Sequence, residues 1–167
     1  MTEFLVLLLF PALIITAAVT DIFTMKISNW ISLILIVGFT LTAILTGMSG
    51  SELLSHIGAG ILVLAVGFGL FCFGLIGGGD AKFLASVALW FGLQDILPLI
   101  LVTALLGGPL CVFLVFMRKY PLPKWVEGEK WAERLHQKDA GAPYGVAISA
   151  AALILYAETP IMKALGT

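Results

Sequence analysis

The sequence predicts an all-α, polytopic membrane protein with six transmembrane helices and its N-terminus outside. Three observations predict this class: the composition, the spacing of the long apolar runs and the placement of the basic residues. Of 167 residues, 60% are hydrophobic and 11% are charged, and the mean hydropathy is +1.11. Such a chain has too little polar surface for a water-soluble domain. The net charge of -1 also provides no broad attraction for nucleic acid.

Six apolar runs come near the roughly 20 residues that a helix needs to cross a bilayer core. We expect the spans at residues 4–20, 30–46, 53–76, 83–93, 96–117 and 142–157. The run 83–93 is the weak one, because its length also suits a tilted span, a re-entrant helix or half of a bent hairpin. The opening Met1-Thr2-Glu3 lacks the basic start of a secretory signal, so we expect the first run to remain as a span.

The basic residues indicate that the short fourth run does cross, because Lys and Arg favour short cytoplasmic loops. With six crossings and the N-terminus outside, the inside segments hold Lys26, Lys82, Arg118, Lys119, Lys124, Lys130, Arg134 and Lys138. Only Lys163 is then outside. Without the fourth crossing, the basic residues of 118–138 would move outside and the asymmetry would reverse. We therefore expect one transmembrane domain over residues 1–167, with a cytoplasmic loop at about 118–141.

That loop mixes aromatic residues with charges of both signs, and two interpretations of it stay open. Residues 124–138 form either an amphipathic helix on the membrane surface or a solvated connector. Elsewhere, Cys72 and Cys111 are isolated in apolar runs without the spacing of a metal site or redox pair, so we expect packing residues. His56 lies near the outer side and is expected to be structural.

Two aspartates stand apart from the other acidic residues. Asp21 and Asp80 each lie at the cytoplasmic end of an apolar run, where burying an isolated carboxylate is costly. Two predicted spans separate them, so the chain returns to the same face and the carboxylates can meet. Two carboxylates in one site cannot both ionise easily, which leaves an acid beside a base near neutral pH. Such a pair can activate water for peptide hydrolysis without a metal or other cofactor.

Helix dipoles predict different roles for the two aspartates. Asp80 is expected where a helix begins, so unpaired N–H groups favour its ionised form and the role of base. Asp21 is expected to follow the end of the first helix, where the dipole favours the protonated form and the role of acid. Substrate binding could exchange these roles, because the proton belongs to the pair. Before Asp80, Gly77, Gly78 and Gly79 remove every Cβ, so the backbone can adopt positive φ or approach a substrate strand.

The residues around both aspartates resemble those of a known family. Gly77-Gly78-Gly79-Asp80 matches the GxGD motif of intramembrane-type aspartic proteases. With Asp21, Ile27-Ser28-Asn29, Lys82 and Pro143-Tyr144-Gly145, the chain closely resembles the type IV prepilin peptidase family, in particular its small Tad-type branch that serves Flp pili. The resemblance covers essentially the whole chain. Ser28 departs from the pattern, since family members commonly have Pro before this Asn.

The resemblance implies an activity, partners and a location. It implies an aspartic endopeptidase of the bacterial cytoplasmic (inner) membrane that removes the short basic leader of Flp-type prepilins. Asp21 and Asp80 would be its catalytic residues and would face the cytoplasm. The expected partners are the prepilin, the lipid bilayer and the pilus assembly machinery, and no nucleic acid. The chain lacks the cysteine-rich insert of larger family members, so we expect no methyltransferase activity, and neither a metal nor a cofactor.

Other family-matching positions have simpler explanations that stay open. Lys82 either anchors its helix at the interface or holds the geometry of the site. Asn29 either shapes the site or caps the second helix in competition with Ser28, and we favour the cap. Within 143–145, Tyr144 is either an interfacial aromatic residue or a wall of the site, and its neighbours are expected to shape the entry into the last span.

Several alternatives to the prepilin peptidase remain. A small transporter or proton-coupled channel also uses paired carboxylates, although no ionisable residue lies near the centre of any predicted span. A non-catalytic assembly factor for a surface structure would use the glycine-rich turns only for packing. Within the proteases, a presenilin-like or preflagellin-type enzyme would carry the same dyad.

Overall fold

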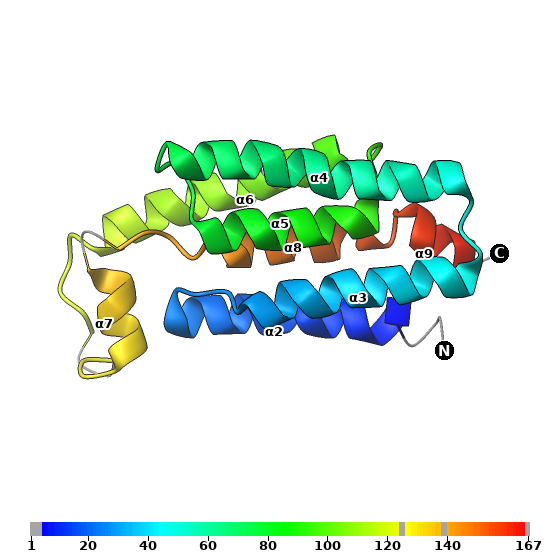
Figure 1. Ribbon diagram of the computed structural model, residues 1–167. Coiled ribbons are helices and arrows are strands. Elements are labelled where there is room, and N and C mark those ends of the chain that lie inside the picture. The colour runs from blue at the N-terminus through cyan, green and yellow to red at the C-terminus, as the bar shows by residue number, and fades with distance from the viewer. Residues whose placement is uncertain (1–4, 124–125, 138–139, 166–167) are drawn as a thin grey trace.

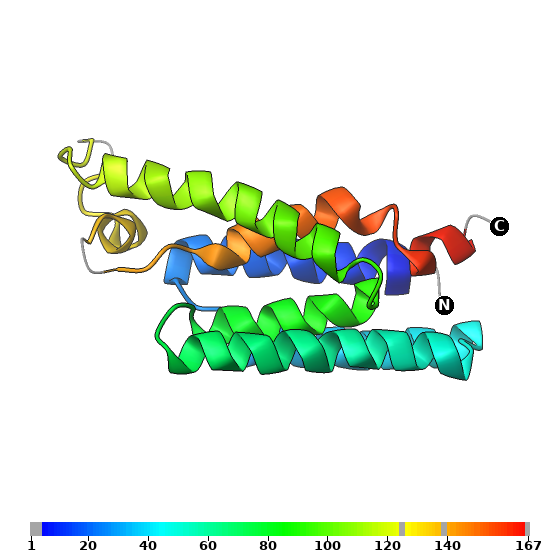
Figure 2. The same ribbon diagram turned by 90° about the horizontal axis from the view of Figure 1, so that it is seen from above.

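The computed structural model describes residues 5–123, 126–137 and 140–165, and these residues form helices joined by short links. In chain order the elements are η1 (Leu5–Leu9), α2 (Phe10–Thr24), α3 (Asn29–Thr46), α4 (Gly50–Cys72), α5 (Gly78–Phe91), α6 (Ile96–Met117), α7 (Lys130–His136), α8 (Tyr144–Tyr156) and α9 (Pro160–Leu165). Figure 1 shows the long helices side by side in one elongated bundle, with α7 at one end of it. The view turned by 90° shows the same bundle (Figure 2).

Five segments are long and apolar enough to cross a membrane: Val6–Thr24, Asn29–Thr46, Gly50–Cys72, Ile96–Met117 and Tyr144–Lys163. Large apolar side chains cover their outer faces. Ile44, Leu54 and Leu105, for example, are 70–71% exposed. Apolar surface of this extent is unfavourable in water and favourable in lipid. The protein is therefore a multi-pass membrane protein.

Helix α5 is the exception to the predicted pattern of six spans. Its 14 residues extend about 21 Å at a rise of 1.5 Å per residue, whereas the hydrocarbon core is about 30 Å thick. By length and composition, five spans are thus supported and α5 is not. Both views nevertheless show α5 running beside α4 and α8 along the bundle (Figure 1, Figure 2). The α2–α3 and α4–α5 links therefore lie at one end, and the α3–α4 and α5–α6 links at the other.

Helix α5 occupies the centre of the bundle. It packs against α3, α4 and α8, and its side chains Phe83, Val87 and Trp90 are completely buried. Gly67 of α4 and Ala81 of α5 approach so closely that a Cβ on Gly67 would lie 3.1 Å from the Ala81 Cβ. Small residues permit this approach, which matters in lipid because helices associate there through packing rather than the hydrophobic effect.

Trp90 connects α5 to the helices around it. Its Nε1 donates a hydrogen bond to the Leu35 carbonyl of α3 (3.0 Å), and its ring centroid lies 4.9 Å from that of Phe10 on α2. Phe10 also stacks on Tyr156 of α8 at 4.1 Å. A buried indole N–H in lipid needs an acceptor from the protein. The Trp90 bond therefore sets the position of α5 along α3.

Helix α2 is longer than the sequence predicted. We expected the first span to end at residue 20 and Asp21 to follow it, but α2 continues to Thr24 and ends at Met25, whose φ is 53°. The continuous apolar run stops at Asp21, but the helical hydrogen bonds of the backbone continue beyond it. The Met25 N–H still donates to the Asp21 carbonyl (2.8 Å). Asp21 thus lies inside the last turn. Residue 4, where the predicted span begins, is outside the described residues.

Glycines with positive φ explain two further differences. The predicted spans 53–76 and 83–93 correspond to α4 and α5, but α4 ends at Cys72, shortly before Gly74 (φ 71°), and α5 ends at Phe91, before Gly92 (φ 78°). Helix α5 also begins earlier than predicted, at Gly78. The spans predicted at 30–46, 96–117 and 142–157 agree with α3, α6 and α8 to within two residues.

The loop after α6 is packed against the bundle. Arg134 of α7 donates from Nη1 to the Phe23 carbonyl in the last turn of α2 (2.7 Å), and Trp131 meets the Phe23 ring edge-on at 5.6 Å. Arg118 donates three more bonds to loop carbonyls, those of Leu135, Ala140 and Gly141. Of the two interpretations left open for 124–138, the helix is found only over Lys130–His136, and residues 124, 125 and 138 are outside the described residues. The loop is thus neither a long surface helix nor a free connector.

Replacing Trp90 with Phe should lower the free energy of unfolding by about 1 kcal/mol, because the hydrogen bond to Leu35 is lost inside the bundle. The measurement is thermal unfolding in mild detergent. Trp30 is 71% exposed, so Trp30→Phe is the matched control and should leave the midpoint unchanged. Equal midpoints for the two variants would contradict the role assigned to the Trp90 bond.

Candidate active site

The structure brings Asp21 and Asp80 to the same end of the bundle. Asp21 lies in the last turn of α2 and is 3% exposed, whereas Asp80 lies in the first turn of α5. Both turns are at the end where α7 lies (Figure 1). Ile27 adjoins both sites, because it contacts the positions of Gly79, next to Asp80, and of Gly145, which binds Asp21. The sequence predicted that both aspartates lie at the same end, from the two helices, α3 and α4, that separate them.

A backbone hydrogen bond holds the Asp21 side chain. The Gly145 N–H donates to Asp21 Oδ2 (2.7 Å), and the Val146 N–H faces the same carboxylate. Both groups belong to the first turn of α8, where N–H groups lack the usual helical acceptor, and the Val146 N–H also donates to the Pro143 carbonyl (3.1 Å). The N-cap residue of α8, Pro143, makes no side-chain cap. Asp21 therefore caps α8 from a different helix, as a local Ser or Asp would normally do.

The contact between Asp21 and α8 leaves no room for a side chain at residue 145. A Cβ built on Gly145 would lie 2.7 Å from Asp21 Oδ2 and 2.7 Å from Cδ1 of Ile27. Gly145 thus contributes both its N–H and its lack of a side chain. The sequence predicted only that it shapes the entry into the last span. The available signal for this role was a glycine at the start of an apolar run. Nothing in the neighbouring sequence indicated that the Asp21 carboxylate would fill the space beside its Cα.

The Asp80 carboxylate folds back onto Gly77, the N-cap residue of its own helix. The Gly77 N–H faces this carboxylate, and a Cβ on Gly77 would lie 2.7 Å from Asp80 Oδ2. An acidic residue in the first turn is favoured by the helix dipole and by the unpaired N–H groups there. Each aspartate is therefore held at a helix N-terminus, next to a glycine. Its carboxylate fills the space that a Cβ on that glycine would need.

Of the other two glycines of the motif, Gly78 is closely packed, whereas Gly79 has room for a side chain. A Cβ on Gly78 would lie 3.2 Å from the Phe71 ring, while one on Gly79 would meet only Ile27, at 3.9 Å. Of the two possibilities that the glycines left open, positive φ does not occur at 77–79; it occurs at Gly74, and the motif itself forms the start of α5. Since Ile27 also contacts Gly145, it lies between the segments that hold the two aspartates.

A cleft of about 780 Å³ opens beside Asp80. Its walls are mainly apolar and include Leu70, Ile76, Leu84, Ile100, Ala104 and Ile148. The polar residues that line it include Asp80, Tyr144 and Arg134. Asp21 is not among the lining residues and is buried behind them. An apolar cleft with a few convergent polar groups is the usual form of a binding site.

Tyr144 forms part of the cleft wall. Its hydroxyl lies beside Cys111 of α6, and Asp80 lines the same cleft. The ring fills the space beside Gly107, where a Cβ would lie 2.7 Å from Tyr144 Cε1. Cys111, expected only to pack, also lines the cleft, whereas Cys72 is exposed.

Lys82 and Asn29 lie away from the cleft. Two residues turn a helix by about 200°, so Lys82 leaves α5 on the side opposite Asp80 and lines a different hollow. Asn29 is exposed at the first position of α3, and the cap is Ser28, whose Oγ accepts from the Trp30 N–H (3.4 Å). Our assignment of the cap to Asn29 was wrong, because the capping residue must precede the first helical one.

His56 is buried at the opposite end and bonds to a backbone carbonyl, as a structural residue does.

Asp21 is buried and Asp80 is half-buried beside an apolar cleft, and two carboxylates in such surroundings are suited to act as acid and base. In the described part of the chain, no three side chains of the metal-binding types His, Cys, Asp and Glu come together.

Residues 8–112 match the model of a protein family that is described as the type IV leader peptidase family. The match covers more than half of the chain and includes Asp21 and 77–80, while 143–145 lie beyond it. No curated protein matches the chain, and no solved structure matches it.

Asp21→Ala should lower the free energy of unfolding by roughly 0.5–2 kcal/mol, because the first turn of α8 loses its cap. Asp21→Asn should cost much less, since an amide oxygen can still accept from the Gly145 N–H. Thermal unfolding in detergent distinguishes the two variants. An equal loss of stability in both would show that the hydrogen bond does not hold α8.

Proposed function

Because the chain belongs to the type IV leader peptidase family, we propose that it is an aspartic endopeptidase that removes the short basic leader from Flp-type prepilins. The observation that carries the proposal is the pair Asp21 and Asp80, held at two helix N-termini at one end of a membrane bundle. The small Tad-type branch is the part of the family to which we assign it. That assignment rests on the motif pattern and on the short loop between α6 and α8.

The proposed reaction uses water as the nucleophile. Asp80, which faces the cleft, takes a proton from water while the oxygen attacks the peptide carbonyl carbon. Protonated Asp21 gives its proton to the carbonyl oxygen, so a neutral tetrahedral intermediate forms. When the C–N bond breaks, the leaving amine takes the proton from Asp80 and Asp21 regains its own. Because Asp21 Oδ2 accepts from Gly145, the proton of Asp21 is placed on Oδ1.

Substrate must reach Asp21 for this reaction to occur. Asp21 is buried and does not line the cleft, and Ile27 lies between the segments that hold the two aspartates. We therefore expect the Ile27 side chain to move when a substrate enters. Catalytic hydrogen bonds often tighten only in the substrate complex, so a closed resting site is consistent with activity.

The proposed topology has six crossings with the N-terminus outside, and α5 crosses where the protein around it thins the apolar layer. The described basic residues at the α7 end, Lys26, Lys82, Arg118, Lys119, Lys130 and Arg134, support a cytoplasmic location for this end. The aspartates then face the cytoplasm at the inner membrane of a bacterium. A prepilin presents its basic leader on that side and its hydrophobic helix within the bilayer.

The cleft supports a substrate of this kind. Its apolar walls suit a hydrophobic helix, and Asp80 lies where such a helix would emerge from lipid. Near this end, the exposed side chains of Glu127, Glu129 and Glu133 carry charge opposite to that of a basic leader. Pilus assembly machinery is a further proposed partner. We propose leader cleavage without N-methylation, because the loop has no cysteine-rich insert.

Asp21→Asn and Asp80→Asn should each abolish leader removal from a co-expressed Flp-type prepilin, while both proteins still insert and fold. The readout is the electrophoretic mobility of the pilin, with thermal unfolding to verify the fold. Glu158→Gln, an exposed carboxylate at the opposite end, is the matched control and should cleave normally. Persistent cleavage by Asp80→Asn would contradict the proposal, and normal pilus assembly by both variants would favour an assembly factor.

Gly145→Ala should lower the cleavage rate by roughly 10- to 100-fold, because the new Cβ displaces the Asp21 carboxylate, and small displacements of catalytic groups have effects of this size. Gly108→Ala on α6 is the control, since a Cβ there has nothing within 4 Å. Initial rates on a prepilin peptide in detergent measure the effect. Equal rates for the two variants would mean that Gly145 does not position Asp21.

A further inference from the structure

Helices α3 and α4 leave a groove between them, which we call the α3–α4 groove. The turn at residues 47–49 joins the two helices, yet each packs mainly on α5 instead of on the other. Two hollows of about 510 and 330 Å³ follow one another along this groove. Both include Ile36, Ile57 and Leu89 in their walls, so the groove is continuous.

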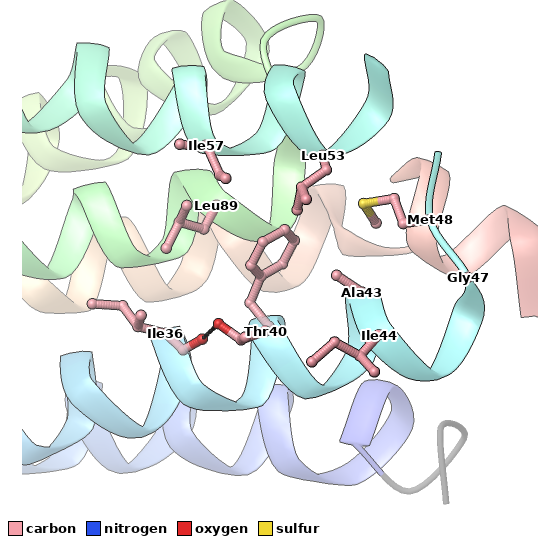
Figure 3. A pocket seen from close by; sticks show the side chains of 10 residues that line it. Ile36, Thr40, Ala43, Ile44, Gly47, Met48, Leu53, Ile57 and Leu89 are labelled. Atoms are coloured by element: carbon pink, nitrogen blue, oxygen red, sulfur yellow. Dashed lines mark hydrogen bonds between the residues drawn. The ribbon is translucent and has the colours of Figure 1, made fainter. Parts of the chain in front are cut away.

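The half of the groove near the α3–α4 turn is apolar. Figure 3 shows Ile57 of α4 and Ile36 of α3 on opposite sides of the hollow, with Leu89 of α5 between them. Ile44 lies nearer to Met48 and the α3–α4 turn. Several of these side chains remain accessible from outside the protein, Ile44 most of all. In a bilayer, the material that fills such a groove must be apolar.

The hydroxyl groups along the groove do not require polar partners from an occupant. Thr40 Oγ1 donates to the Ile36 carbonyl within α3 (2.9 Å; Figure 3), and Ser86 Oγ donates to the Phe83 carbonyl within α5 (2.7 Å). Hydroxyls that are satisfied by their own helix present mainly their carbon atoms to a neighbour. The groove therefore suits a hydrocarbon chain along most of its length.

One end of the groove differs, because it carries a positive charge. Lys82 lines the hollow at the end where α5 begins, together with Ser32 of α3. Lys82 is exposed, and among the described residues it forms no ion pair. An apolar groove that ends at an ammonium group and a hydroxyl is complementary to an amphiphile with an anionic head.

The geometry argues against a substrate helix in this groove. Helix α5 separates it from the cleft: Lys82, Ala85 and Leu89 face the groove, whereas Asp80 and Leu84 face the cleft. A peptide in the groove would thus be on the wrong side of α5 to reach Asp80. A spanning helix is also a cylinder roughly 10 Å wide and 30 Å long, with a volume above about 2000 Å³, which exceeds both hollows.

We propose that the α3–α4 groove binds one anionic phospholipid, with the phosphate against Lys82 and one acyl chain along the groove toward Met48. Anionic lipids are abundant on the cytoplasmic leaflet, the side on which the proposed topology places Lys82. The bound chain fills the space between α3 and α4 and supports α5 from the face opposite Asp80. The lipid thereby stabilises the helix that carries this aspartate.

The charge part of the proposal is tested with phosphatidylglycerol, and with phosphatidylcholine as the neutral comparison, added to the protein in mild detergent. Phosphatidylglycerol should raise the midpoint of thermal unfolding more than phosphatidylcholine does, and native mass spectrometry should show one retained molecule. Lys82→Gln should weaken the phosphatidylglycerol titration about fivefold, as expected for one lysine near an anionic head group. Lys26→Gln, at the same end but outside the groove, should not.

The chain part is tested by filling the groove. Thr40→Phe places a ring in the hollow of Figure 3, and should remove the stabilisation by phosphatidylglycerol. Thr16→Phe is the control, because Thr16 is also exposed, with its hydroxyl bonded inside α2. Lipid-free midpoints verify that both variants fold. Equal effects of the two lipids on the wild type, equal losses in Lys82→Gln and Lys26→Gln, or undiminished binding by Thr40→Phe would each overturn the proposal.

Discussion

The hydrogen bond from the Gly145 N–H to the Asp21 carboxylate joins α2 to α8, and the rest of the site depends on it. Near lipid, neither the open end of a helix nor a buried carboxylate can rely on water, so each must be satisfied by the protein. Here the first turn of α8 donates a hydrogen bond to the Asp21 carboxylate, so each of these two groups has a partner. The same contact fixes where α8 begins, and therefore where Tyr144 and Ile148 stand in the wall of the cleft. Asp21, a residue suited to proton transfer, thus also holds α2 and α8 together.

Helix α5 combines three roles because it is short, central and different on each face. Its first turn presents Asp80 to the cleft, its opposite face forms the floor of the α3–α4 groove, and its far end carries Trp90 into the aromatic core. Close packing against α4 depends on small residues such as Gly67 and Ala81.

The second half of the chain completes a site whose motif lies in the first half. The family match ends at residue 112, yet Gly145 holds Asp21, and Arg134 both bonds to the last turn of α2 and lines the cleft. The positive side chain of Arg134 at that carbonyl end is favoured by the helix dipole. The loop and α8 therefore connect the cleft directly to the helix that carries Asp21.

The sequence by itself determined the membrane class, the long apolar helices and the position of Asp21 and Asp80 at one end of the bundle, because hydropathy, run length and the number of intervening helices are local or additive properties. It also contained the angle that separates Lys82 from Asp80, since that follows from helix geometry. Only the tertiary structure decided that Asp21 lies within α2 and caps α8, that Gly145 must lack a Cβ, and that Gly77 accommodates a carboxylate rather than a positive φ. These features arise from contacts between groups as far as 124 residues apart, and no local pattern specifies which distant group will occupy the space beside a glycine.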